Sequence, residues 1–305
     1  MTEGFHKSWF DTTPQSSSTS REAIFVETLH ENISSFSENG FVLIRRSTSQ
    51  DKTALKKLES EILTHLSELE SSFLYRVKRL LGVSAVRSAE KRHAISLPRS
   101  DLLINVASNA IRSAFPVLAS QLTLNSALVD LSSIISLPGS ERQKTHSDIA
   151  FSKSDKIISG FVALSQVNIS NGPTCLFAGS HKMSFHKRHV DNSLLGESHY
   201  SADGTSSMYE QNNTLINSNL SETQSVELTM RSLPYAAILN IGDVLIYDSQ
   251  LFHFGGANTS VLPRVLLMFG FQQCTPWGQI DKINGFTYHC DKTIAGKYCL
   301  NDFKT

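Results

Sequence analysis

Residues 242–271 read GDVLIYDSQLFHFGGANTSVLPRVLLMFGF, and this stretch decides the fold. Its apolar ends and its glycine-rich middle predict a strand, a tight turn and a second strand. His253 lies at the mouth of the turn, and Arg264 begins the second strand. Arg264, Leu266 and Met268 share one face of that strand, and the alternate residues share the other. We therefore expect Arg264 to project with apolar neighbours into a cavity, while the opposite face packs against helices.

A second block, Thr145-His146-Ser147-Asp148, offers two metal-binding side chains at positions i and i+2. Side chains at that spacing point to the same face of a strand. Together with His253, they supply two imidazoles and one carboxylate, which would cap one side of an octahedral iron and leave the other side open. A single His-x-Asp tripeptide arises by chance, so the prediction of an iron site depends on the combination with His253 and Arg264.

Arg264 needs an anionic partner if it is buried, because an isolated buried charge is unfavourable. The planar guanidinium matches a carboxylate through two parallel hydrogen bonds and stays charged when buried. We predict that the partner is the distal carboxylate of 2-oxoglutarate. The alternative is a structural salt bridge to an acidic residue such as Asp243 or Asp248.

The composition bounds these predictions. The chain has 305 residues, of which 40% are hydrophobic, and its 28 basic residues balance 28 acidic ones. A chain of this size can bury a large core, and we expect one domain over residues 1–305. The balanced charge argues against binding to nucleic acid or to an anionic membrane surface. Four separate cysteines without a CxxC pair favour a reducing compartment, and we expect a cytoplasmic protein.

The first half of the chain predicts helices. We expect residues 1–18 to be flexible, a helix over 20–37 with a capping box at Thr19 and Glu22, and a short strand over 41–44. A second helix, capped by Asp51, is expected to run to Gly82, and a third to span 100–115 and end at Pro116. The basic stretch 83–98 is either a solvated surface or the rim of a pocket for an acidic substrate.

From about residue 127 the pattern changes to short strands separated by Gly, Pro and Asn. The expected strands span 127–135, 148–151, 157–167, 175–177, 225–228, 236–239, 244–247 and 264–271. About eight such strands with flanking helices predict a mainly β protein with a double-stranded β-helix core, a jelly-roll or cupin-like fold, and N-terminal helices packed on one sheet. Residues 186–224 form a long polar connection, which we interpret as a lid over the cavity.

Several blocks resemble the phytanoyl-CoA dioxygenase-like family of iron(II)/2-oxoglutarate-dependent oxygenases. They are the segment FSENGFVLI at 36–44, the pair His146 and Asp148, the segment NGPTCLFAGSHK at 171–182, and HFGGANTS at 253–260 followed by Arg264. Their order is the family's order. The resemblance implies that His146, Asp148 and His253 hold iron(II), that Arg264 holds 2-oxoglutarate, and that O2 is the other cosubstrate.

The chain departs from the family at the second donor to the 2-oxoglutarate carboxylate. The family often places a serine two residues after its arginine or its distal histidine, and here those positions are Leu266 and Gly255. We consider three other donors, Thr174, Gln143 and Tyr247.

The resemblance implies oxidation of a C–H bond of a small organic molecule, with release of succinate and CO2. Hydroxylation is the expected reaction, although desaturation or oxidative ring closure, as in the kainoid synthases of marine algae, needs no different metal ligands. Two alternatives stay open, a catalytically silent metal-binding or regulatory protein on the same fold and a metal-dependent hydrolase.

Basic residues suggest an anionic substrate, such as a carboxylic acid or a coenzyme A thioester. The residues that we predict to contact this substrate are Arg92, His93, Lys144, His181 and Lys182. A solvated face would explain the lysines equally well.

Overall fold

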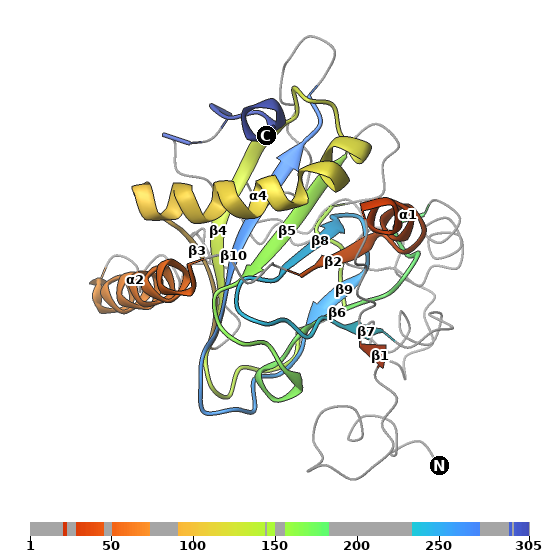
Figure 1. Ribbon diagram of the computed structural model, residues 1–305. Helices are drawn as coiled ribbons and strands as arrows, with labels where there is room; N and C mark the ends of the chain where they lie inside the picture. The colour runs from red at the N-terminus through yellow and green to blue at the C-terminus, as the bar shows by residue number, and fades with distance from the viewer. Residues whose placement is uncertain are drawn as a thin grey trace, which may run out of the picture.

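Two β-sheets face each other, and helices cover the outer side of the larger one (Figure 1). This computed structural model describes residues 21–22, 29–45, 51–73, 91–143, 145–149, 156–182, 234–274, 293–294 and 296–304. The expected lid at 186–224, the flexible segment 1–18 and the strand expected at 225–228 lie outside these residues.

The larger sheet has six strands in the order β2-β8-β5-β10-β4-β3, all paired antiparallel. Their bounds are β2 Phe41–Ile44, β8 Val244–Asp248, β5 Ile157–Ala163, β10 Arg264–Gln272, β4 Ala127–Ser136 and β3 Arg92–Ser96. The smaller sheet has the order β1-β7-β6-β9, with β1 Arg21–Glu22, β7 Tyr235–Ala236, β6 Thr174–Leu176 and β9 His253–Gly255. In the smaller sheet β6 pairs antiparallel with β7 and β9, and β1 pairs parallel with β7. Two facing, mostly antiparallel sheets with these crossovers confirm the predicted double-stranded β-helix.

The alternation predicted for the last long strand is confirmed. Val265, Leu267 and the phenylalanines of β10 pack in the cluster that joins the larger sheet to the helices. Leu266 and Met268 belong instead to the cluster between the two sheets. The period of two in this strand therefore separates the cavity side of the sheet from the helix side.

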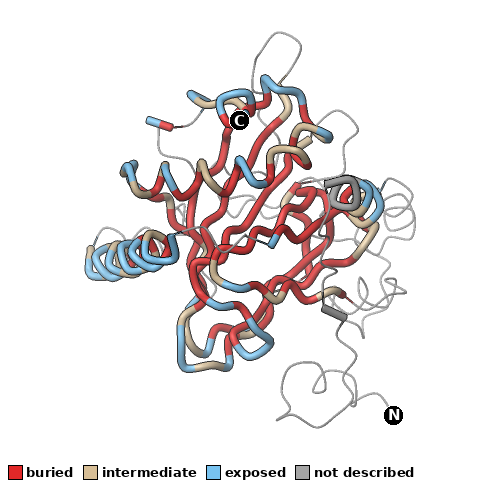
Figure 2. The backbone as a smooth tube through the Cα atoms, viewed as in Figure 1, coloured by how far each residue is buried: buried red, intermediate tan, exposed pale blue. Residues whose placement is uncertain are grey.

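Three helices pack on the outer face: α1 Leu29–Asn39, α2 Lys52–Ser71 and α4 Asp101–Gln121. Asp51 caps α2 as predicted, because its side chain accepts from the Thr53 N–H at 2.9 Å. Figure 2 shows that the strands are buried along nearly their whole length, whereas α2 leaves one side exposed. Leu55, Leu58, Ile62 and Leu66 form its buried stripe. The prediction that this helix runs to Gly82 is wrong, because α2 ends at Ser71, and Phe73 beyond it is 76% exposed.

Two further helix boundaries were predicted wrongly. The capping box at Thr19 and Glu22 is wrong, because Glu22 lies in strand β1 and the helix begins at Leu29. Pro116 does not end α4, which continues to Gln121. Proline removes one backbone hydrogen bond, but the next turn buries Val117 and Leu118 completely, and this packing keeps the chain helical.

Helix α4 is long and apolar enough to cross a bilayer, by length and composition alone. In the structure it lies across the larger sheet, and it buries a stripe of residues from Leu103 to Leu118 against that sheet (Figure 1). The same composition is typical of the core helix of a folded domain.

Candidate metal centre

Three ligand-type side chains converge from separate parts of the chain. His253 begins β9, and His146 and Asp148 lie in the segment that follows β4. An isolated antiparallel bridge joins the two histidines, with His146 N–H donating to the carbonyl of His253 at 2.9 Å and the reverse bond at 2.8 Å. These two backbone bonds hold the imidazole rings 4.6 Å apart, centroid to centroid. Asp148 lies in a bend and not in the strand predicted over 148–151.

The ligand atoms of His146, Asp148 and His253 all lie within 4.8 Å of one another. Nε2 of His146 is 3.8 Å from Oδ1 of Asp148, and Nε2 of His253 is 3.6 Å from the same oxygen. These separations exceed an ordinary hydrogen bond, and they suit groups that share one ion between them.

The backbone sets the tautomer of His253. Its Nδ1 lies 2.9 Å from the carbonyl oxygen of Leu251, which can only accept a hydrogen bond. The proton of a neutral imidazole is therefore on Nδ1, and the lone pair of Nε2 points toward Asp148. A histidine that binds a metal through one ring nitrogen usually donates the N–H of the other nitrogen to a carboxylate, a backbone carbonyl or water. His253 has such a partner, so the residues present fit a metal ion.

Asp148 is held from behind by Tyr247 of β8. The phenol donates to Oδ2 of Asp148 at 2.8 Å, so Oδ1 is the oxygen that faces both histidines. Burial, followed by the charge of Asp148, raises the pKa of Tyr247 well above its usual value, so the phenol keeps its proton. Because this single hydrogen is given to Asp148, Tyr247 is not available as the 2-oxoglutarate donor that we had predicted.

The predicted arginine is buried and faces the same cavity. Arg264 is 1% exposed, and it donates to the carbonyl of Gly172 and, at 2.9 Å, to Oγ of Ser136. Burial, followed by the charge of Arg92, lowers its pKa to about 9, so it stays charged at neutral pH. Among the described residues no carboxylate forms an ion pair with Arg264, and its Nε lacks a hydrogen-bond partner. The alternative of a structural salt bridge to Asp243 or Asp248 is therefore wrong for this part of the chain.

Two glycine-rich turns of the sequence motifs bring the acceptor of Arg264 into place. Gly172 has a φ of +76°, and a Cβ atom there would lie 2.2 Å from the carbonyl oxygen of Gly256. Asn258 donates to the carbonyl oxygens of Ser136 and Leu262, which fixes the turn before Arg264. The NGP segment at 171–173 and the HFGGAN segment at 253–258 therefore contact each other, which explains why the chain contains both.

Arg92 lies beside Arg264 and was placed in a stretch that we had described as basic and irregular. It begins strand β3 and is 3% exposed, so the interpretation as a solvated surface is wrong at this residue. Its guanidinium donates to Oγ of Ser136 at 2.6 Å and to the carbonyls of Glu141 and Gly256 at 3.0 and 2.7 Å. Burial lowers its pKa to about 10.

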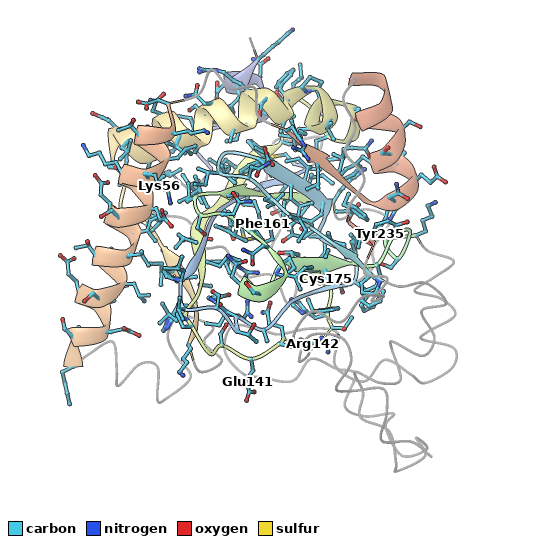
Figure 3. All side chains as sticks on the ribbon, turned by 60° about the horizontal axis from the view of Figure 1, so that its bottom comes forward. Lys56, Glu141, Arg142, Phe161, Cys175 and Tyr235 are labelled. Atoms are coloured by element: carbon cyan, nitrogen blue, oxygen red, sulfur yellow. The ribbon has the colours of Figure 1, made fainter. Side chains whose placement is uncertain are left out.

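A single cavity collects most of the predicted site residues. Its lining includes the three metal ligands, Arg264, Arg92, His93, Gln143, Thr174 and Tyr247. Phe161, Leu266 and Met268 form its apolar wall. Figure 3 shows Phe161 in the interior, with Glu141 and Arg142 at the end of the molecule opposite α4.

The structure does not place the other residues that we predicted to contact the substrate in this cavity. His181 packs against Gly40 and Leu251, outside the cavity lining, and Lys182 beside it is exposed. Lys144 lies outside the described residues. Gln143, which we considered as a donor to 2-oxoglutarate, lines the cavity. Its Oε1 accepts from the N–H of Gly255 at 2.9 Å, and an amide donates through Nε2, so this role stays a prediction. Substrate contacts by His181, Lys182 and Lys144 stay predictions.

Asp130 and Ser136 were not predicted as residues of this site. Both belong to β4, whose sequence ALVDLSSIIS places Asp130, Ser132 and Ser136 on one face of a buried strand. Asp130 lines the cavity and accepts from the hydroxyl of Ser132 at 2.7 Å. Several polar side chains on one face of an otherwise apolar strand were the signal that could have identified this cavity wall.

The chain resembles known proteins in sequence and in fold. Residues 36–265 match the family model described as phytanoyl-CoA dioxygenase (PhyH). A non-heme alpha ketoglutarate dependent carbocyclase, SnoK, from nogalamycin biosynthesis has a similar structure, with a TM-score of 0.53 and 14% identity over 80% of this chain and 83% of that chain. EvdMO1 gives a TM-score of 0.50 and 16% identity over 81% of this chain and 50% of that chain. No curated protein matches the sequence. At these identities the structural likeness shows the fold.

Proposed function

The chain belongs to the phytanoyl-CoA dioxygenase (PhyH) family and is a 2-oxoglutarate-dependent non-haem iron dioxygenase; we propose that it oxidises a C–H bond of a small organic molecule. The cofactors of this enzyme class are iron(II), 2-oxoglutarate and O2. The observation that carries the proposal is the convergence of His146, Asp148 and His253 on one point of a cavity that Arg264 also lines.

His146, Asp148 and His253 would hold iron(II). When bound, the ion supplies the activation of O2 and the oxidative decarboxylation of 2-oxoglutarate, chemistry that amino-acid side chains do not provide. Imidazole and carboxylate are ligands that suit ferrous iron, and three of them on one side leave positions for cosubstrates. The protein's own contribution is to hold these donors in one fixed, largely buried arrangement.

Arg264 and Arg92 would bind the distal carboxylate of 2-oxoglutarate. Two buried cations without an acidic partner among the described residues fit an anion, and a carboxylate accepts hydrogen bonds from two guanidiniums. In this assignment Arg92 takes the role that the family often gives to a serine. It approaches the cavity beside Gly255, where a Cβ atom would lie 2.6 Å from its Nη1.

Apolar side chains supply the rest of the cavity. Phe161, Leu266 and Met268 offer an apolar wall for the reacting carbon, and Asp130 adds one carboxylate. The substrate class that this wall supports is a small organic molecule with a hydrocarbon portion next to the metal. Hydroxylation is the expected outcome, and ring closure or desaturation would follow if the substrate radical were held away from the metal.

Succinate formation from 2-oxoglutarate tests the proposal before any substrate is known. The purified protein with iron(II), ascorbate and O2 should slowly convert 2-oxoglutarate to succinate, and His146→Ala and Asp148→Ala should abolish the conversion. Arg112→Ala, on the exposed side of α4, serves as the control. Metal binding without succinate would favour a silent binding protein. Zinc-dependent hydrolysis that ignores 2-oxoglutarate would favour a hydrolase.

A further inference from the structure

Tyr247 is a buried polar residue to which the proposed reaction assigns no role. Its side chain is 1% exposed, and its ring stacks on Phe161 at 5.3 Å and meets the His253 ring edge-on at 5.1 Å between centroids. A phenylalanine would fill this place equally well, so packing explains the ring and leaves the hydroxyl unexplained. The hydroxyl donates to Oδ2 of Asp148 at 2.8 Å, and it also shares a hydrogen bond with the side chain of Ser159.

The backbone holds Asp148 beside Tyr247 independently of this bond. Asp148 N–H and Ile149 N–H both donate to the carbonyl of Ser249, at 2.9 and 3.2 Å, and Ser249 follows two residues after Tyr247. Strand β8 points Leu245 and Tyr247 toward the space between the sheets, and Val244 and Ile246 toward the helices. The backbone therefore fixes the positions of both residues, and the hydrogen bond sets only the rotation of the carboxylate group about its own axis.

How the carboxylate is turned matters for the number of open metal positions. An octahedral ion has six positions, of which the three protein ligands take three if Asp148 binds through one oxygen. The positions that stay open would serve 2-oxoglutarate and O2. If Asp148 bound through both oxygens, one of these positions would be lost. In the structure Oδ1 faces both histidines, and Oδ2 is turned away toward Tyr247.

We infer that Tyr247 is a positioning residue that keeps Asp148 a one-oxygen metal ligand and thereby leaves a coordination position open. This inference rests on the proposed function, because it concerns the same three metal ligands. Groups behind metal ligands raise metal affinity by fixing the ligand's orientation, typically by ~10- to ~100-fold. A hydrogen bond from Tyr247 to Oδ2 also leaves the charge of the carboxylate concentrated at Oδ1, where the ion binds.

The test is Tyr247→Phe, which removes one oxygen and keeps the ring. Cobalt(II), whose visible spectrum depends on coordination number, is titrated into the metal-free protein without O2, and 2-oxoglutarate is then added. We expect cobalt(II) affinity to fall on the order of tenfold, and the absorption of the bound ion to differ from wild type in shape as well as in intensity. Tyr235→Phe is the matched control, because Tyr235 lies in β7 outside the cavity lining.

Unfolding temperatures of both metal-free variants separate this role from a structural one. Equal cobalt(II) affinity and an unchanged spectrum in Tyr247→Phe, with or without a lower unfolding temperature, would overturn the inference while leaving the proposed function intact. Loss of stability in the metal-free state together with normal cobalt(II) binding assigns the hydroxyl to folding alone. If wild-type protein binds cobalt(II) no more tightly than His146→Ala does, the proposed function and the inference fail together.

Discussion

Arg92 and Arg264 donate to the same hydroxyl oxygen, Oγ of Ser136, at 2.6 and 2.9 Å. Their strands are not neighbours, since β4, which carries Ser136, lies between β3 and β10 in the larger sheet. Two buried cations held by one neutral group repel each other, and the charge of Arg92 is among the causes that lower the pKa of Arg264. A bound carboxylate would remove this repulsion.

Arg92→Gln should therefore weaken 2-oxoglutarate binding selectively. Glutamine keeps a donor but loses the charge, and a hydrogen bond to a charged group contributes about 1.5–3 kcal/mol, so the Kd should rise on the order of tenfold or more. Pyruvate has the same chelating end but no distal carboxylate, and its Kd should stay at the wild-type value. Calorimetric titration of the nickel(II)-loaded protein measures both constants without turnover.

The outcome for pyruvate decides what Arg92 does. If both keto acids lose affinity equally in Arg92→Gln, the residue supports the metal site or the fold and not the carboxylate. Arg112→Gln, which changes an exposed arginine of α4, should leave both constants unaltered.

Arg264→Lys tests the geometry of the second cation. Lysine keeps the charge, but it is a single donor point and does not reproduce two parallel N–H groups. It would also not span Gly172 and Ser136 at once. We expect the KM for 2-oxoglutarate to rise by tenfold or more in the succinate assay, with a smaller change in kcat. Arg99→Lys, near the surface, is the control, and an unchanged KM in Arg264→Lys would contradict the assignment.

His181 predicts an acid-sensitive contribution to stability. Burial, followed by the charge of Lys182, lowers the pKa of His181 from 6.5 to about 4. The unfolded chain therefore binds a proton at a higher pH than the folded chain does. The contribution of neutral His181 is fully present above pH 6.5 and is lost as the pH falls toward 4. His181→Gln should flatten the loss of unfolding free energy between about pH 7 and about pH 5 in urea titrations.

The contribution of Asp248 to stability changes with pH in the opposite direction, so it must be separated from that of His181. Burial raises its pKa to about 6, so its contribution is present in acid and is lost as the pH rises through that value. Because Asp248 is common to wild type and His181→Gln, its contribution cancels in their difference. Parallel pH profiles of the two proteins would show that His181 is not the titrating group.

The grouping of His146, Asp148 and His253 and the presence of Arg264 in the same cavity were predictable, because iron and carboxylate binding constrain both residue type and spacing. Alternation in residues 264–271 also gave the cavity face of β10 correctly. The location of His253 was less well predicted, because three residues are too few to show a period. His253–Gly255 is a strand of its own, in the smaller sheet, and not part of a turn between two strands of one sheet.

Arg92 shows where local patterns fail. Its neighbours Lys91 and His93 suggest a solvated surface, yet β3 pairs with β4 and turns Arg92 into the cavity. That pairing depends on contacts between residues about 40 positions apart, such as Arg92 with Ser136, which no window of sequence contains. Pro116 is the converse case, in which a strong local signal is overridden by the packing of the following turn.

Gly172 and Gly179 offer a matched pair for the last prediction, since both have a φ of +76°. Alanine at Gly179 would meet only the carbonyl of Glu38 at 3.7 Å, so its effect is the backbone strain alone, about 1 kcal/mol. Alanine at Gly172 would place Cβ 2.2 Å from the carbonyl oxygen of Gly256. The two turns would have to separate, and we expect a loss of about 3 kcal/mol or more in chemical denaturation.

Separation of these turns has a second consequence, because the carbonyl of Gly172 accepts a hydrogen bond from Arg264. Gly172→Ala should therefore raise the Kd of 2-oxoglutarate in the nickel(II)-loaded protein, whereas Gly179→Ala should not. Measuring both variants at a temperature where each remains folded keeps stability and affinity apart. Equal losses of stability in the two variants would mean that the turns adjust without strain, and an unaltered Kd in Gly172→Ala would mean that Arg264 keeps its position without this acceptor.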